Sequence, residues 1–428
     1  MKHTTRWQQD AQIVTQYSWP LILAYLLQYS LPATSVFTIG HLGQIELGAV
    51  SLGTMTANVT GHAVYMGLAS SLDTLCAQAY GSGQKQLVGI HLQKMVLLLW
   101  SVTVPIGVIW FNSEHILGAM VPDREMARLA ALYLKILLIG APGWCAFESG
   151  KRFVQAQGLF RANLYVLLTI APLNVFLHWL FVWRLGWGFV GAPIAVAISN
   201  CSLPLGLIFY VRFVDGRQCW GGFSRTSFRH WGPMIRLALP GFLMLEAEWL
   251  AFEIVTLSAS WLSPTHLAAQ GILMTLATLG SQVPLPFGIA VATRIANLIG
   301  ASHAPAAWRS AKVGLTGALL LGTCNTCILA SLTNTIPRLF THDEEVISLV
   351  ANTLPLCAAF QLVDALANTC NGIMRGIGRQ GVGGYVALCC FYLVRSCIPP
   401  IFFVPVLIPP RLVFPSLSAL VSHCTGIC

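Results

Sequence analysis

The segment Tyr17–Ile39, YSWPLILAYLLQYSLPATSVFTI, contains no Lys, Arg, Asp or Glu and is long enough to cross about 30 Å of hydrocarbon as a helix. A second apolar segment lies 220 positions further on, at 237–259, and it again has proline as its fourth residue (240 − 20 = 220). The same offset relates Asp123 to Asp343. These matches predict one six-helix unit present twice, an arrangement typical of transporters that bind substrate between two lobes.

Composition places the chain in a lipid bilayer. Hydrophobic residues make up 56% of the 428 residues and charged residues only 9%, against about a quarter in a typical soluble domain. We predict an all-α integral membrane protein with about twelve transmembrane helices in two pseudo-symmetric six-helix lobes. The expected spans lie near 17–39, 48–76, 88–112, 127–149, 162–184, 190–211, 237–259, 265–293, 310–332, 346–374 and 385–406, with an irregular twelfth near 410–426.

The distribution of basic residues predicts the orientation. With the N-terminus in the cytosol, seventeen of the twenty-four Lys and Arg residues fall in inner segments, and acidic residues offset most of those outside. The net charge of +9 is therefore explained by the inner loops. We expect the bilayer as a partner and no nucleic acid.

The longest polar stretch separates the two halves. We predict a cytosolic N-terminus over 1–16, an N-terminal lobe over 17–211, a linker over 212–236 and a C-terminal lobe over 237–428. No phosphate-binding loop that ends in Lys-Ser or Lys-Thr is present in the sequence, so the energy for transport is expected from an ion gradient. We expect no cofactor and no metal site. The coupling ion is expected to be a proton or sodium, and the protein is expected to be a monomer.

The C-terminal lobe has an atypical tail from about residue 393. Arg395 stands in the middle of an expected span, and six prolines follow between 399 and 415. Prolines remove backbone donors and a central arginine is costly in lipid, so helices 11 and 12 are predicted to be irregular.

Several motif matches are set aside. The glycines at 376, 378 and 381 follow an apolar helix rather than a strand, so we interpret them as a turn and not as a dinucleotide site. Cys324 and Cys327 lie inside an apolar helix without a second ligand pair. The histidines are scattered, and neither H-E-x-x-H nor a nucleophile elbow occurs, so an enzyme is not expected.

Carboxylates at membrane depth require an explanation, because each charge costs about 2.5–3.5 kcal/mol there even on a lenient scale. Glu148 precedes Lys151 and Arg152 by three and four residues, which favours a snorkelling, locally paired group at the interface. Asp73 either caps polar groups or helps to bind an ion. The others are Glu246, Glu248, Glu253 and Asp364.

Three of these carboxylates lie within Leu243–Glu253, LMLEAEWLAFE, and cannot all face lipid. At about 100° per residue, Glu246 and Glu253 share a helix face, whereas Glu248 and Glu253 diverge by about 140°. Asp364 belongs to the same half and could converge with them. The alternative is a purely architectural polar network.

Several specific strings follow one another along the chain: FTIGHLGQIELGAV, LASSLDTLCAQAYGSG, VGIHLQ, FESGKRFVQAQG, GWGFVGAPIAVAIS, ALPGFLMLEAEWLAFE, VATRIANLIGA and CNGIMRGIGRQGVGGY. In this order, and from about residue 17 to 385, the chain resembles multidrug and toxin extrusion transporters of the eukaryotic type.

This resemblance implies antiport of organic cations or toxins against protons or sodium, in a plasma or vacuolar-type membrane. It also implies that Glu248, Glu253 and Asp364 form the cation site of the C-terminal lobe. Gln28 and Asn58 would line the first lobe. Helical periodicity favours Glu246 over Glu248, and here we follow the resemblance and keep Glu246 as an additional cavity residue.

The expected mechanism is competition at carboxylates that bind either a proton or a cation but not both, so that each binding event favours a different facing of the lobes. Trp249 could add cation–π attraction of about 0.5–2 kcal/mol, or simply pack between helices. Two alternatives remain: a lipid or lipid-linked flippase of a related fold, and an inactive variant with an aberrant C-terminus.

Overall fold

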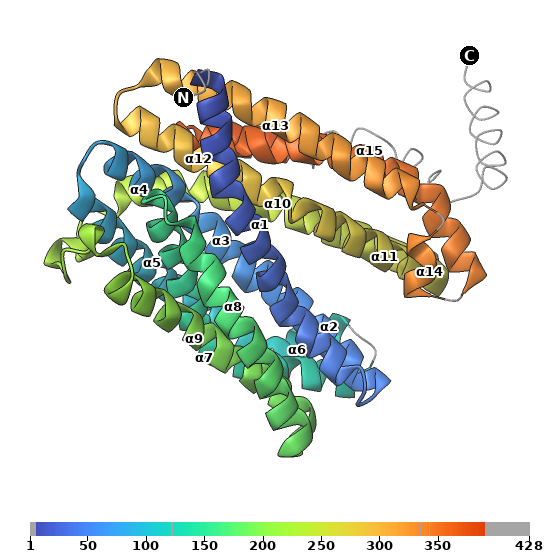
Figure 1. Cartoon of the computed structure of the whole chain (residues 1–428). Coiled ribbons are helices and arrows are strands. Elements are labelled where there is room, and N and C mark those ends of the chain that lie inside the picture. Colours follow the sequence, from blue (N-terminus) through green and yellow to red (C-terminus); the bar gives the residue numbers. More distant parts are fainter. Residues whose placement is uncertain (1–5, 121–122, 334, 342, 390–428) are drawn as a thin grey trace, which may run out of the picture.

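The computed structural model describes residues 6–120, 123–333, 335–341 and 343–389, which form helices and no strand (Figure 1). The N-terminal half contains α1 Arg6–Ile39, α2 Gln44–Ala57, α3 Ala63–Ala69, α4 Ser71–Gly81, α5 Lys85–Phe111, α6 Ser113–Met120, α7 Arg124–Ala156, α8 Phe160–His178 and α9 Gly191–Phe213. The C-terminal half contains α10 Gly232–Leu262, α11 Pro264–Ser281, α12 Pro284–Gly300, α13 Ala304–Ser331, α14 Ile336–Phe340, α15 Glu344–Gly376 and α16 Gln380–Leu388.

Eight helical stretches in the described part of the chain are long and apolar enough to cross a membrane. The helix α10 has a comparable length of 31 residues but carries three glutamates. The prediction of an all-α, multi-pass membrane protein is confirmed. The predicted irregularity from about residue 393 falls in 390–428, outside the described residues, and stays a prediction.

The first helix begins at Arg6, eleven residues before the apolar segment that predicted it (17 − 6 = 11). Its polar first turns have partners in the C-terminal half. Asp10 Oδ1 lies 3.3 Å from Arg294 Nη2, and Asp10 Oδ2 lies 2.7 Å from Arg309 Nε. Val14 packs in an apolar cluster of that half. An apolar pattern cannot signal such a start, because long-range contacts stabilise it.

The 220-residue offset corresponds to equivalent helix ends. Asp123 caps α7 and Asp343 caps α15, each by accepting hydrogen bonds from the backbone N–H groups two and three residues later. The turns that follow the same two helices contain Gly158 at φ 79° and Gly378 at φ 76°. A positive φ favours glycine, so these two glycines mark the ends of the helices. Both copies therefore contain the capping aspartate that begins the helix and the glycine in the turn that follows it.

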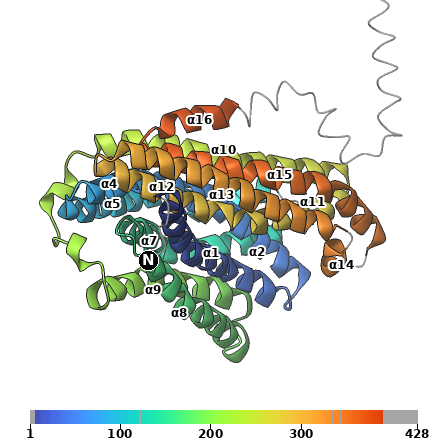
Figure 2. The same ribbon diagram turned by 45° about the horizontal axis from the view of Figure 1, so that its top comes forward.

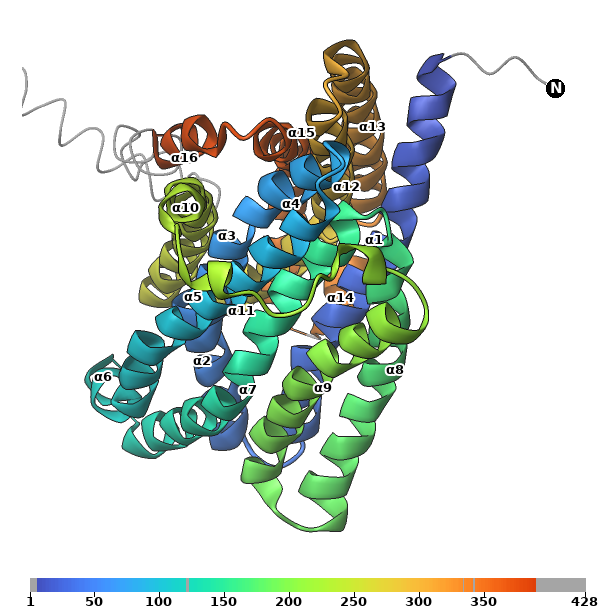
Figure 3. The ribbon, with the colours of Figure 1, turned by 90° about the vertical axis from the view of Figure 1, so that its left-hand side faces the viewer.

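The two halves meet at one end of the molecule. In Figure 1 the green helices α7–α9 and the orange helices α13 and α15 diverge from a contact between α4 and α12, which Figure 3 shows side by side. Figure 2 shows α1 between the two bundles, in contact with α8 of one half and α12 and α13 of the other.

Reciprocal glycines allow α4 and α12 to approach closely. A Cβ atom at Gly81 would collide with the backbone of Asn297, and one at Gly300 would collide with the backbone of Gln78. Both residue pairs are related by 219 positions (300 − 81 = 297 − 78 = 219), which indicates a pseudo-two-fold axis. We call the contact formed by residues 67–81 with residues 242, 297–300 and 375–380 the inter-lobe seam.

The connector between α9 and α10 folds back onto α5. The Gln93 side chain donates to the Gly222 carbonyl at 2.7 Å and accepts from the Ser224 backbone N–H at 3.1 Å and the Ser227 hydroxyl at 2.8 Å. Cys219 is fully buried beside this contact. The boundaries of the predicted linker and lobes remain predictions, but this connector is anchored to the N-terminal half.

Candidate functional site

Asp364 lies in the middle of α15 and is 7% exposed. The Ser281 hydroxyl donates to its Oδ2 at 2.8 Å, and the Asn368 side-chain amide donates to its Oδ1 at 3.0 Å. Each carboxylate oxygen therefore has one neutral donor and free lone pairs. This arrangement holds an ionised carboxylate in place and leaves it able to bind a cation.

Helix α10, which carries Glu248, contacts α15 where the ring centroids of Phe252 and Phe360 lie 6.4 Å apart. Glu246 is half-buried, and its Oε2 has no hydrogen-bond partner within the described residues. Glu253 lies on the same helix, but its side chain is outside the described residues. The cation site of Glu248, Glu253 and Asp364 that the resemblance implied stays a prediction.

A second group of charges lies in the N-terminal half. Glu148 Oε1 is 2.6 Å from Lys151 Nζ, and Oε2 is 2.5 Å from Arg152 Nη1. Gln28 joins this group by accepting from Lys151 at 3.0 Å and donating to Glu148 at 3.5 Å. The predicted local pairing is confirmed, but snorkelling is wrong, because all three charged side chains are at most 4% exposed.

Asp73 belongs to the inter-lobe seam and is 4% exposed, and its predicted place in a cavity stays a prediction. Its Oδ1 lies 3.6 Å from Arg152 Nε of the same half, and its Oδ2 lies 3.7 Å from Arg375 Nη1 of the other. The Arg375 carbonyl accepts a hydrogen bond from Thr74. One carboxylate is therefore shared between the two halves.

The remaining predicted cavity residues lie elsewhere. Asn58 opens a π-helical turn between α2 and α3, and its side-chain oxygen lies 3.1 Å from His62 Nδ1. Trp249 is half-buried on α10. The structure does not place Asn58 in contact with Gln28 or Asp73 among the interactions of the described residues.

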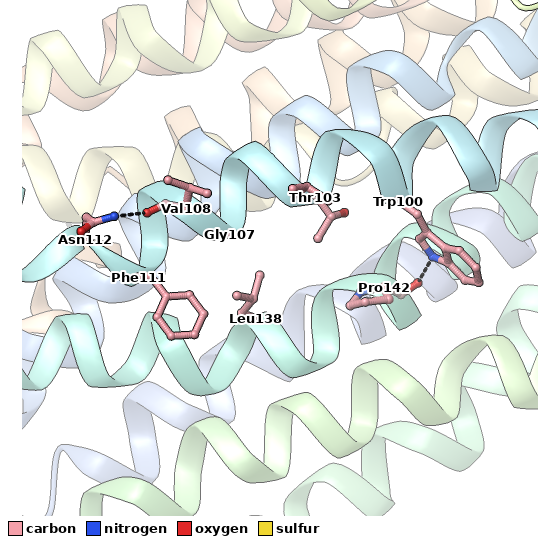
Figure 4. Close-up of a pocket in the computed structure, with 9 residues that line it drawn as sticks. Trp100, Thr103, Gly107, Val108, Phe111, Asn112, Leu138 and Pro142 are labelled. Carbon is pink, nitrogen blue, oxygen red and sulfur yellow. Dashed lines mark hydrogen bonds between the residues drawn. The ribbon is translucent and has the colours of Figure 1, made fainter.

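A groove lies between α5 and α7 (Figure 4). Val104, Val108 and Phe111 in its wall are 59–68% exposed. Trp100 donates to the Pro142 carbonyl at 3.1 Å. Because its lining contains no charged side chain, we interpret this groove as lipid-facing surface rather than as a cation site.

Sequence reasoning missed the burial of Lys151, Arg152 and Arg375. The spacing of Glu148, Lys151 and Arg152 indicated an ion pair, and it gave no information on burial. Burial of these charges depends also on α4 and α15, because Asp73 of α4 and Arg375 of α15 approach each other only in the folded chain.

In the described residues, an all-helical bundle of two opposed halves with buried carboxylates is typical of membrane transporters. A family model described as MatE matches residues 20–180 and 240–401, so that its two matches begin 220 residues apart (240 − 20 = 220). The chain belongs to this family of multidrug and toxin extrusion transporters.

Relatives and solved structures agree with the family. An uncharacterized transporter of Saccharomyces cerevisiae is 43% identical over 91% of this chain and 56% of its own length, so the chain spans little more than half of that relative. Multidrug and toxin extrusion protein 2 of Mus musculus is 34% identical over 90% of this chain and 67% of its own length. The crystal structure of the eukaryotic MATE transporter AtDTX14 superposes with a TM-score of 0.87 at 26% identity, over 91% and 88% of the two chains.

Proposed function

We propose that the protein exports organic cations in exchange for protons or sodium, through the carboxylates of its C-terminal half. The observation that carries this proposal is that some carboxylates have a basic side chain as a close partner and others do not. Asp10, Asp73 and Glu148 all have Lys or Arg within 4 Å. Within the described residues, Glu248 and Asp364 have no Lys or Arg within 4 Å, and the helices that carry them contact each other through Phe252 and Phe360.

Carboxylates that have no Lys or Arg at contact distance favour binding of an external cation. A proton or an organic cation removes the same negative charge, so the two ligands compete for one site. A ligand changes the equilibrium between two facings of the lobes only by its different affinity for them. Competition at a site that faces each side in turn then produces exchange rather than passive leak.

The inter-lobe seam supplies the contacts that alternate. Gln78 donates to the Gly376 carbonyl at 3.1 Å and Gln380 donates to the Ser70 carbonyl at 3.4 Å, each across the two halves. With the N-terminus in the cytosol, the seam closes the cytosolic side of this state. These contacts must break when the site opens to the cytosol to receive substrate.

The test is transport of a fluorescent organic cation by purified protein in liposomes, driven in separate experiments by a proton or a sodium gradient. Glu248→Gln and Asp364→Asn should each abolish gradient-driven transport. Glu114→Gln, a control that removes an exposed carboxylate 3.5 Å from Lys135, should transport normally. Parental rates in both site variants, at equal incorporation, would disprove the proposal, and a gradient-independent phospholipid flip would favour a flippase instead.

We further propose that the protein is a monomer resident in a plasma or vacuolar-type membrane with its N-terminus in the cytosol. The excess of basic residues in the inner segments supports this orientation. Protease protection of an N-terminal tag in sealed vesicles would test it, and a tag digested only from the outside of the cell would refute it.

A further inference from the structure

Lys151 is one of the largest fully buried side chains of the described structure, with 1% of its side chain exposed. Its ammonium lies 2.6 Å from Glu148 Oε1 and 3.0 Å from Gln28 Oε1. It also lies 5.2 Å from the ring centroids of both Tyr25 and Phe147. A carboxylate, an amide oxygen and two aromatic rings are a ligand set that suits an organic ammonium ion.

The surrounding residues form a complete site around this ammonium. Tyr25 and Gln28 project from α1, whereas Phe147 and Glu148 come from α7, so two helices contribute one ring and one oxygen ligand each. Glu148 and Phe147 are fully buried and Tyr25 is 6% exposed. Burial of an ammonium costs several kcal/mol, and only partners as close as these offset that cost.

The rest of the charge balance does not require Lys151. Arg152 Nη1 already lies 2.5 Å from Glu148 Oε2, and Arg152 and Arg375 both lie within 4 Å of Asp73. Two carboxylates therefore have two guanidinium partners without the lysine. The ammonium adds a third positive charge, and its place is determined by the oxygen and aromatic ligands of this one site.

We propose that Lys151 is a built-in ligand, which permanently occupies a site for alkylammonium ions in the N-terminal half. This inference rests on the proposed cation export and deepens it: cations from outside then bind only at the C-terminal carboxylates, where the described residues supply no internal ammonium. The two halves share a fold but not a role, because one carries its own cation.

Chemical replacement of the missing ammonium tests the proposal. Lys151→Ala deletes three methylene groups and the ammonium, the atoms that n-propylammonium supplies. The midpoint of thermal unfolding of the purified full chain should fall in this variant and rise again with n-propylammonium chloride, but not with equal concentrations of sodium chloride. Lys312→Ala is the matched control, since Lys312 is an exposed lysine whose ammonium lies 5.5 Å from the Trp308 ring, and it should show no selective response.

A second variant covers the case in which Lys151→Ala does not fold. Lys151→Met keeps most of the volume without the charge, so its unfolding midpoint should fall and should recover when Glu148→Gln removes the carboxylate whose Oε1 has lost its ammonium partner. A parental midpoint for Lys151→Met, or a response of Lys151→Ala to n-propylammonium no greater than to sodium, would overturn the proposal. Neither measurement involves transport, so its failure is distinct from a failure of Glu248→Gln to block export.

Discussion

Neutralising Asp73 should open the inter-lobe seam, because this carboxylate is shared by the two halves. Asp73→Asn keeps the size of the side chain and removes the charge that faces Arg375 at 3.7 Å. Arg152 keeps Glu148 as a partner at 2.5 Å, whereas Arg375 has no other carboxylate within 4 Å in the described part of the chain. The variant therefore leaves one buried guanidinium unpaired, and it lies at the seam.

The expected magnitude follows from distance and burial. At 3.7 Å the pair is beyond hydrogen-bond length, and its Coulomb energy is about 4 kcal/mol at an effective dielectric constant of about 20. A neutral amide costs less to bury in the closed seam than a carboxylate does, which offsets much of this energy. We expect a net shift of about 1–3 kcal/mol toward the open seam, or about 5–150-fold in the conformational equilibrium.

Hydrogen–deuterium exchange of the purified protein measures this shift. Peptides from α4 and from the end of α15 should exchange faster in Asp73→Asn, while peptides from α8 should not change. Glu125→Gln is the control: its partner Arg128 also lies at 3.7 Å, but both side chains are more than half exposed, so the effect should be about 0–1 kcal/mol. Unchanged exchange of the α4 peptides in Asp73→Asn would refute the role given to this ion pair.

Three further predictions concern other parts of the chain. Ser281→Ala removes the donor to the proposed cation site at 2.8 Å and should slow cation transport, but less than loss of the carboxylate itself; an equal loss would indicate misfolding. Glu246→Gln should reduce transport less than Glu248→Gln, and the reverse order in the same liposome assay would favour the helical-wheel assignment. Burial raises the pKa of the Cys219 thiol to about 11, so alkylation at pH 7.5 should be slow and should accelerate in Gln93→Ala, which frees the connector; equal rates by mass spectrometry would show that Gln93 does not anchor it.

The apolar runs and the 220-residue offset predicted most of the fold because both signals are local. A run without charges marks a span wherever it packs, and the caps at Asp123 and Asp343 mark helix starts from the residues beside them. The prediction failed where a polar helical turn had a distant partner. The first turns of α1 are helical because Asp10 pairs with arginines almost 300 residues away.

The candidate site, like the fold, was predicted from the sequence only where the signal was local. Sequence by itself identified Glu246, Glu248, Glu253 and Asp364 as too costly to face lipid, because that cost depends only on charge and depth. Spacing along one helix did not decide between Glu246 and Glu248. The choice depends on which neighbouring helix each side chain faces, and spacing within a single helix carries no information on that.

Composition, hydropathy and the internal repeat were thus enough to establish a two-lobe membrane bundle, because each is a property of single segments. Only the tertiary structure showed which buried charges already have partners. Glu148 and Lys151 are neighbours on one helix, but their burial requires α1, and Asp73 meets Arg375 only where the two halves touch. The pairing of charges across helices depends on the packing of distant segments, so it was decided by the fold rather than by any local pattern.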